Sequence, residues 1–429
     1  KTAYEMIWRL EFRRVLFRSE SICAVVGRAD LLAAAFGLLA ALLHLGATTR
    51  HRLAAAAALL LALLCKESAL ALFALLPLID LFQYRLFSRK CYSLSYLLYA
   101  GIAGLYLAWR YYVLGTLTLG EIDPFDNPLV GAEPAMRIYD AVAIAFRYLG
   151  LLVLPAHLSA DYSYAALTPS AAFEIGSLVG IGLGLSALIF LLYKSFQSNS
   201  AVFFGLGWFC IALAPVSNIL IPIGTVMGER LLYLPAMGFC VALAAQLQTI
   251  RRYAPPIALL LVTLFATRSA VRTSDWRDNY TLFQEATRVQ PQSARAWRGL
   301  GNAAMERQQR ERALISLGRA LRIHPDYYEV HVDLAHHYLS IGQPDIARRH
   351  LATSLQLRAD YPPAWFALGL VLYKLGEKTD AARAFEQALQ LDPSYADAAY
   401  NLGVIQLDSG QPKRAQTYFQ RTLTLDPEH

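Results

Sequence analysis

Long apolar runs follow one another through residues 20–273, whereas residues 274–429 show the mixed apolar and polar pattern of soluble helices. A helix needs about 20 apolar residues to cross a bilayer. The pattern predicts spanning helices over eight stretches: 21–45, 53–65, 68–83, 93–113, 173–193, 201–221, 231–249 and 255–271. A ninth stretch, 138–156, has Arg147 in its middle and Pro155 near its end, which favours a re-entrant or interfacial helix. We expect an all-α protein that begins with a polytopic membrane helix bundle.

The polar part of the chain repeats with a period of 34 residues, the length of a tetratricopeptide unit. Large and small residues recur at this spacing, as in Trp297, Leu300, Gly301, Ala313 and Ala320, and again in Trp365, Leu368, Gly369, Ala381 and Ala388. Such units stabilise one another because none buries its apolar faces alone. We predict a membrane domain over 20–273 and an α-solenoid over 274–429, with a half unit followed by four units starting near 294, 328, 362 and 396.

The formal net charge of +7 belongs wholly to the membrane part, because residues 275–429 carry 18 basic and 18 acidic side chains. A soluble part without a basic face argues against a nucleic-acid partner. Basic clusters that follow four of the apolar stretches predict the cytoplasmic loops. This topology places the repeats on the non-cytoplasmic side. If 138–156 crossed the membrane once, the repeats would lie in the cytoplasm.

The first nineteen residues carry five basic and two acidic side chains and lack the apolar core of a secretory signal. A basic interfacial helix is one interpretation. We expect instead a doubtful leader over 1–19, foreign to the rest of the chain.

Ionisable and polar residues gather in or beside the membrane segments, where they are costly and commonly functional. The candidates are Glu20, Arg28, Asp30, Lys66, Glu67, Asp161, Tyr162, Glu229 and Arg230. Arg28 and Asp30 are two residues apart on a helix, so we expect each to have its own partner elsewhere. One interpretation is a set of ion pairs at helix ends that fix packing. The other is a polar cavity at the outer membrane surface.

The chemistry of such a cavity follows from its residue types. Arginine and lysine suit a phosphate or pyrophosphate, and carboxylates orient a sugar or accept a proton. The sequence has no glycine-rich phosphate loop, no Ser-His-Asp order and no zinc-protease motif, so it predicts no metal ligands. A requirement for a divalent metal stays open.

Several short motifs, taken in order, resemble the transmembrane and tetratricopeptide-repeat O-mannosyltransferases and their bacterial relatives. The matching stretches are ESICAVVGRADLL at 20–32, CKE at 65–67, DNPL at 126–129, RYLG at 147–150, SADYSY at 159–164, PVSNI at 215–219, ERLLYLP at 229–235 and DWR at 275–277. The resemblance covers 20–429. It implies a membrane glycosyltransferase of the GT-C type that transfers mannose from a polyprenyl-phosphate carrier to serine or threonine hydroxyls outside the cytoplasm.

The resemblance also assigns roles to the candidates. Glu20 matches the glutamate that closes a His-Pro-x-x-x-Glu element, although Phe17-Arg18-Ser19 stand in place of the rest of it. The acidic pair of the family's first outer loop would precede Glu20, so we expect this chain to be an N-terminally truncated fragment whose own activity is open. Glu20 and Asp30 are the catalytic candidates. Arg28, Lys66, Glu67, Asp161, Tyr162, Glu229 and Arg230 are the candidates for binding the sugar and lipid phosphate.

Two other functions stay open at this point. A membrane-anchored scaffold would present the repeats to partner proteins, and its charged residues would only stabilise the fold. A transporter would show related membrane halves and broken helices, which the sequence does not. As an enzyme, the chain is expected in a bacterial inner membrane or the endoplasmic reticulum, in contact with the lipid bilayer, a lipid-linked sugar and an acceptor protein.

Overall fold

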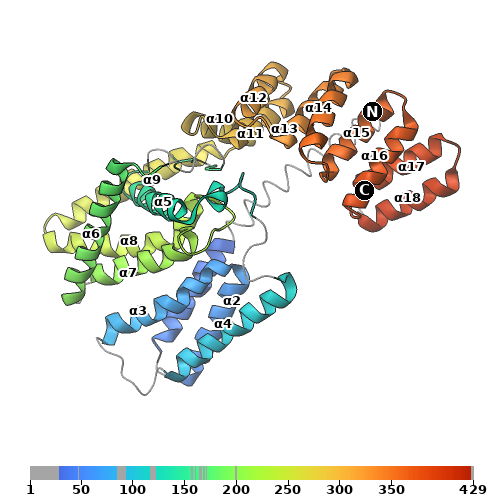
Figure 1. Ribbon diagram of the computed structural model, residues 1–429. Coiled ribbons are helices and arrows are strands. Elements are labelled where there is room, and N and C mark those ends of the chain that lie inside the picture. The colour runs from blue at the N-terminus through green and yellow to red at the C-terminus, as the bar shows by residue number, and fades with distance from the viewer. Residues whose placement is uncertain are drawn as a thin grey trace. The chain divides into compact units, whose positions relative to one another are not determined.

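The protein is described by a computed structural model that covers residues 29–46, 48–84, 93–115, 122–155, 158–159, 161–163, 167, 170, 172–198 and 201–426. Within these ranges it is helical and has no β-strand, which confirms the all-α fold class (Figure 1). The chain divides into two compact units between Arg277 and Asp278. The expected leader over 1–19 lies outside the described residues.

The first unit is built from apolar helices joined by short 3₁₀ turns. After a helix over Ala29–His44 come α2 (Thr49–Cys65), η1 (Glu67–Ala71), α3 (Leu72–Tyr84), α4 (Ser93–Leu114), η2 (Pro128–Gly131), α5 (Pro134–Val153), α6 (Ile175–Gln197), α7 (Ala201–Leu213), η3 (Ala214–Val216), η4 (Glu229–Leu232), α8 (Tyr233–Leu247), η5 (Gln248–Ile250) and α9 (Ala254–Asp275).

Four described segments are long and apolar enough to span a membrane: Ser95–Leu114, Ile175–Gln197, Glu229–Ile250 and Ala254–Asp275. Ala29–His44 and Ala201–Val216 are shorter apolar helices. The span expected over 201–221 is therefore too long. Pro215 has no amide hydrogen to continue the helix, and Asn218 has a φ of 60°, outside the helical range. The chain from Ser217 to Gly228 is irregular.

Helices α7 and α8 pack with their backbones in close approach. A Cβ placed on Gly205 would lie 2.5 Å from the Gly238 carbonyl oxygen, and one on Gly238 would lie 2.5 Å from the Gly205 carbonyl oxygen. Ala242, one turn after Gly238, is buried in the same contact. Small residues four apart allow this packing in membranes, where apolar burial between helices contributes little. The contact fixes the first half of α7 against the middle of α8.

The second unit is a row of paired helices (Figure 1). A single helix, α10 (Asn279–Val289), precedes four pairs: α11 (Ala294–Glu306) with α12 (Arg310–Ile323), α13 (Tyr328–Ser340) with α14 (Pro344–Leu357), α15 (Pro362–Lys374) with α16 (Lys378–Leu391), and α17 (Ala396–Asp408) with α18 (Pro412–Leu425). Trp297 and Trp365 make the same hydrogen bond, from the indole Nε1 to the carbonyl oxygens of Pro291 and Ala359.

The turn inside each pair needs one residue with left-handed backbone. Gly342, Gly376 and Gly410 supply it with φ of 76°, 85° and 72°, and Gln308 adopts a φ of 61° at the same place in the first pair. These positions are 34 residues apart. A side chain there costs about 1–2 kcal/mol because its Cβ approaches the following carbonyl.

We therefore expect Gly376→Ala to destabilise α15 and α16 by about 1–2 kcal/mol. Gly318→Ala is the matched control. It lies inside α12 with open space around its Cβ, so the substitution stabilises the helix by up to about 1 kcal/mol. Amide hydrogen exchange in the two helix pairs measures both changes. Equal effects of the two substitutions would contradict this explanation of the turn.

The second pair also contains a pair of facing histidines. The Nδ1 atoms of His331 and His350 are 3.1 Å apart, and the Tyr338 ring stacks on His350. Burial lowers the pKa of both imidazoles, and the charges of His331 and Arg349 lower that of His350 further. In the first helix pair, α11 and α12, Trp297 and Ser316 occupy the equivalent positions.

A lowered histidine pKa means that the unfolded repeats bind more protons than the folded ones below about pH 6.5. We therefore expect the free energy of unfolding of α13 and α14 to fall as the pH decreases from about 7 to about 5. The double variant His331→Trp/His350→Ser carries the residues of the first helix pair at these positions. Its free energy of unfolding should depend less on pH. Hydrogen exchange at several pH values tests this, and an unchanged slope in the variant would refute it.

Candidate functional site

Asp30 and Lys66 form an ion pair between the start of the first described helix and the end of α2. The side chains are only 13% and 19% exposed, respectively. Lys66 has extended backbone, with φ −161° and ψ 137°, so it ends α2 and turns its side chain toward Asp30. The pair joins the sequence motifs at 20–32 and 65–67. The Asp30 Oδ2 atom is buried and has no hydrogen-bond partner in the part of the chain that the structure describes.

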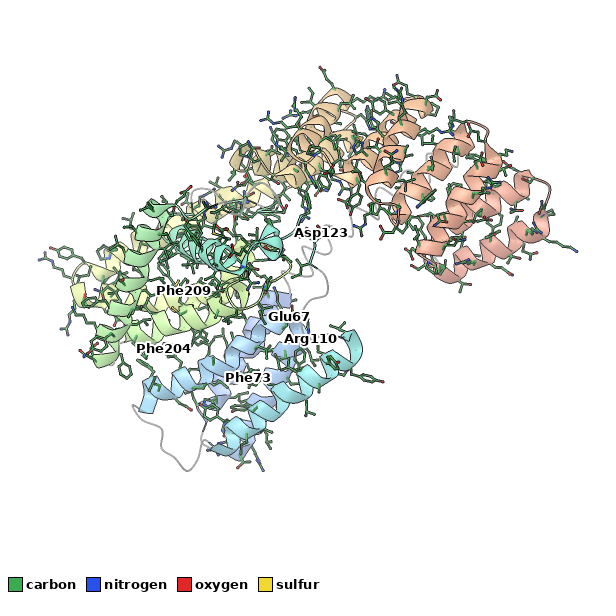
Figure 2. All side chains as sticks on the ribbon, viewed as in Figure 1. Glu67, Phe73, Arg110, Asp123, Phe204 and Phe209 are labelled. Carbon is green, nitrogen blue, oxygen red and sulfur yellow. The ribbon has the colours of Figure 1, made fainter. Side chains whose placement is uncertain are left out.

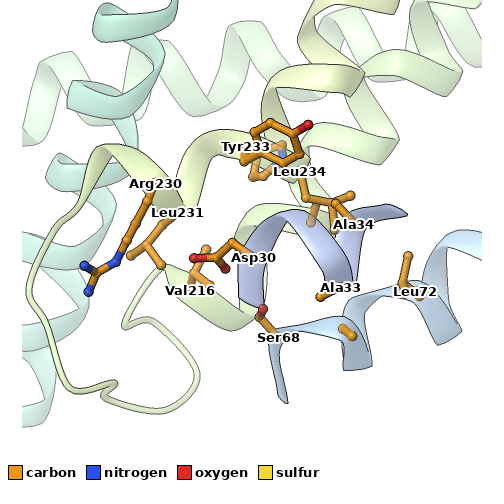
Figure 3. Close-up of a pocket in the computed structure, with 13 residues that line it drawn as sticks. Asp30, Ala33, Ala34, Ser68, Leu72, Val216, Arg230, Leu231, Tyr233 and Leu234 are labelled. Atoms are coloured by element: carbon orange, nitrogen blue, oxygen red, sulfur yellow. The ribbon is translucent and has the colours of Figure 1, made fainter. Parts of the chain in front are cut away.

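A small cavity lies beside this ion pair. Asp30, Ser68, Arg230 and Tyr233 are the lining residues with polar groups, and the remainder are apolar: Ala33, Ala34, Ala69, Leu72, Ala212, Val216, Leu231, Leu234 and Pro235. Figure 3 shows the Asp30 carboxylate directed toward the segment that carries Arg230 and Leu231. The volume is about 30 Å³, enough for one or two water molecules. The cavity has room for a hydroxyl group but not for a sugar ring.

Glu67, beside Lys66, takes a different partner. Its Oε2 lies 2.6 Å from Nη1 of Arg110 in α4 (Figure 2). The Glu67 side chain is 44% exposed and that of Arg110 is 11% exposed. A partly exposed pair of this kind contributes little to stability, so its main effect is to orient α4 against the α2–η1 turn.

Glu229 and Tyr162 meet in a second cluster. The Tyr162 hydroxyl donates to Glu229 Oε1 at 2.9 Å, and the Ser159 amide donates to the same oxygen at 2.6 Å. Burial, together with the neighbouring Glu229 carboxylate, raises the pKa of Tyr162 well above its usual value. The phenol therefore stays protonated and remains a donor. These contacts connect the loop at 158–163 to η4, where the next residue, Arg230, lines the Asp30 cavity.

Asp161 lies in the same loop and shapes it locally. Its Oδ2 accepts from the Ser163 hydroxyl at 2.8 Å and from the Ser163 amide at 3.3 Å. The side chain is buried. The candidates thus form two groups that share η4: Asp30, Lys66 and Arg230, and Asp161, Tyr162 and Glu229. Glu20 and Arg28 lie outside the described residues.

A pair of asparagines, absent from the candidates, holds the irregular chain before η4. The Asn127 amide nitrogen donates to Asn218 Oδ1 at 2.8 Å and to the Ile223 carbonyl at 2.7 Å. Asn218 also donates to the carbonyls of Thr225 and Val226, both at 3.1 Å. Asn127 belongs to the motif DNPL and Asn218 to the motif PVSNI, so the family resemblance could have identified both as candidates.

Other anchors come from α5 and α9. The Gly228 amide donates to the Tyr148 hydroxyl at 2.8 Å, and Arg268 Nε donates to the Pro155 carbonyl at 2.9 Å. Arg272 is buried near the end of α9 and pairs with Asp275 at 3.1 Å. Neither arginine was among the candidates drawn from the sequence.

No group of three or more metal-ligating side chains occurs among the described residues. The chemistry that the two groups offer is that of carboxylates, guanidinium groups, an ammonium group and a phenol beside apolar helices. Such groups accept a proton, orient hydroxyls and neutralise an anion.

Comparison with known proteins agrees with both parts of this description. Residues 267–328, 332–396 and 366–429 match the sequence model of the tetratricopeptide repeat. The chain is 28% identical over 248 residues to the protein O-mannosyl-transferase Tmtc3 of Drosophila melanogaster, covering 54% of this chain and 27% of that protein. It is 26% identical over 335 residues to TMTC4 of Mus musculus, covering 66% and 44%. A crystal structure of MamA is similar at 21% identity and a TM-score of 0.32, covering 37% of this chain and 94% of MamA.

The fold and the comparisons define a helical membrane protein that carries tetratricopeptide repeats. Its curated relatives are protein O-mannosyl-transferases, which confirms the resemblance drawn from the motifs. The chain spans between about a quarter and under half of the length of these relatives.

The asparagine pair leads to a prediction about stability. Asn218→Ala removes buried hydrogen bonds and leaves backbone carbonyls without partners, so we expect a loss of about 2–4 kcal/mol. Asn218→Gly loses the same bonds but tolerates the positive φ, and should be less destabilised by about 1 kcal/mol. Thermal unfolding of the two variants in detergent measures the difference. A wild-type unfolding temperature for Asn218→Ala would rule out the proposed role.

Proposed function

We propose that this chain forms part of a membrane glycosyltransferase. It would transfer a mannose-like sugar from a polyprenyl-phosphate carrier to a protein hydroxyl on the non-cytoplasmic side of the membrane. The names of the curated relatives support the reaction class. The basic clusters that follow the apolar stretches support the sidedness. The observation that carries the proposal is the cavity that Asp30 and Arg230 share beside Lys66.

This arrangement suits the transfer of a sugar to a hydroxyl group, because it combines a carboxylate that can accept a proton, Asp30, with two cations, Lys66 and Arg230. Lys66 neutralises one oxygen of Asp30, and the other oxygen is buried with no partner from any described residue. Arg230 is exposed and makes no ion pair with any residue that the structure describes. Its guanidinium remains available for an anion, while Asp30 remains available for a hydroxyl group.

The proposed reaction is a displacement at the anomeric carbon of the sugar. The acceptor hydroxyl gives its proton to a carboxylate, for which Asp30 is the described candidate. The hydroxyl oxygen forms a bond to the anomeric carbon as the bond from that carbon to the phosphate oxygen breaks. The electron pair of the broken bond stays on the lipid phosphate. Lys66 and Arg230 stabilise the negative charge that develops there.

The repeats would hold the acceptor protein or another partner. Stacked helix pairs form an extended concave surface, and the described repeats supply four pairs in a row (Figure 1). With the repeats on the non-cytoplasmic side, as the positive-inside rule predicts, a bound polypeptide would be on the side where the sugar is transferred.

We expect Asp30→Asn and Arg230→Ala to reduce sugar transfer by about 10²–10³-fold each in the full-length protein, while the fold is retained. Arg251→Ala, an exposed arginine in the turn before α9, is the matched control and should retain activity. The measurement is transfer of a radiolabelled sugar from a polyprenyl phosphate to a Ser/Thr peptide in nanodiscs. Undiminished transfer in Arg230→Ala would exclude its role. If the protein is a scaffold, all three variants behave like the wild type and none shows transfer.

A further inference from the structure

Arg272 has a guanidinium group that is buried but only partly used. The residue is 8% exposed, and Nη1 is paired with Asp275. The Nε and Nη2 atoms are buried and have no hydrogen-bond partner among the described residues. An unpaired edge of a buried cation is costly. It therefore requires an explanation beyond the packing of α9.

The two unpaired atoms belong to the same edge of the guanidinium. Their N–H bonds run nearly parallel and form the fork that binds two oxygens of a phosphate or carboxylate at once. No described carboxylate takes this position, because Asp275 binds Nη1 and Glu229 accepts from Ser159 and Tyr162. Among the described residues, nothing occupies the fork, and an anion could bind there.

The surroundings of the fork connect it to the second cluster. Arg272 is close enough to act electrostatically on both Tyr162 and Glu229, and Arg268 also acts on Glu229. Two guanidinium groups therefore lie near one carboxylate whose hydrogen bonds are already supplied by the loop at 158–163. Glu229 precedes Arg230, which lines the Asp30 cavity.

The position of Arg272 along α9 indicates the kind of anion. This helix has 22 residues and is about 33 Å long, close to the thickness of the hydrocarbon core. Its apolar side chains Leu260, Leu264 and Val271 are 58%, 57% and 57% exposed. An arginine one turn from the end of such a helix lies at the depth of lipid head groups, where a free anion is less concentrated than a lipid phosphate.

We propose that Arg272 binds the phosphate of a polyprenyl-phosphate lipid through its Nε and Nη2 atoms. The proposal rests on the glycosyltransferase function proposed above and adds a residue to its donor site. Neither donor atom has accessible surface, so binding requires the covering side chains to move apart. Arg272 is a binding residue here, and no step of the transfer is assigned to it.

The test uses the full chain in phosphatidylcholine nanodiscs and measures the dissociation constants of a short polyprenyl phosphate and of the matching neutral polyprenol. We expect the wild type to prefer the phosphate by tenfold or more. Arg272→Lys keeps the positive charge but loses the two parallel N–H donors. It should remove most of the preference for the phosphate over the alcohol. Arg251→Lys, at the opposite end of α9, should keep it. Equal wild-type affinity for both lipids, or an unchanged preference in Arg272→Lys, would overturn the proposal.

Two further measurements distinguish a lipid phosphate from a free phosphate, and a failure of the Arg272 site from a failure of the transferase function. Inorganic phosphate at millimolar concentration should not displace the polyprenyl phosphate, and displacement at similar affinity would show a site for free anions instead. The ratio of the two lipid affinities remains measurable even if Arg272→Lys lowers stability. Binding is measured without turnover, so a full-length protein that shows no transfer but still prefers the phosphate would refute the transferase function and leave the Arg272 site intact.

Discussion

Irregular backbone within an apolar helix bundle must find its hydrogen-bond partners inside the protein, and Asn218 meets this requirement between α7 and α8. Its amide bonds Asn127 on one side and the carbonyls of Thr225 and Val226 on the other. The chain can then leave the helical path after α7 without losing its pairing. The irregular segment positions η4 so that Glu229 and Arg230 join the two clusters of polar side chains.

The apolar pattern predicted a helix well wherever that helix coincides with a single continuous apolar stretch of the sequence. Segments 93–113, 173–193, 231–249 and 255–271 each coincide with a helix long enough to span. The pattern failed at 201–221, because hydropathy does not register the left-handed backbone of Asn218 or the partners that stabilise it. The 34-residue period predicted the repeats for a local reason, since each turn and each close contact recurs at a fixed distance along the chain.

The site was predicted in part and for an identifiable reason. A charge such as Asp30 or Lys66 inside an apolar run stands out in the sequence, and the structure shows these two in contact. Arg272 does not stand out, because it lies where an apolar run gives way to a polar one. Only the packing of α9 shows that its guanidinium is buried. Which charges pair is likewise a tertiary property, so the partnership of Glu67 with Arg110 rather than with its neighbours could not be foreseen.

The contact between Gly205 and Gly238 has a consequence for how sequences of this kind can vary. Each glycine faces main-chain atoms of the other helix, and main-chain atoms are the same for every amino acid. A larger residue at either position cannot be accommodated by a smaller side chain opposite, as happens in a core of interlocking side chains. Compensating pairs of substitutions are therefore excluded here. Related sequences would have to keep both glycines or lose the close packing of α7 against α8.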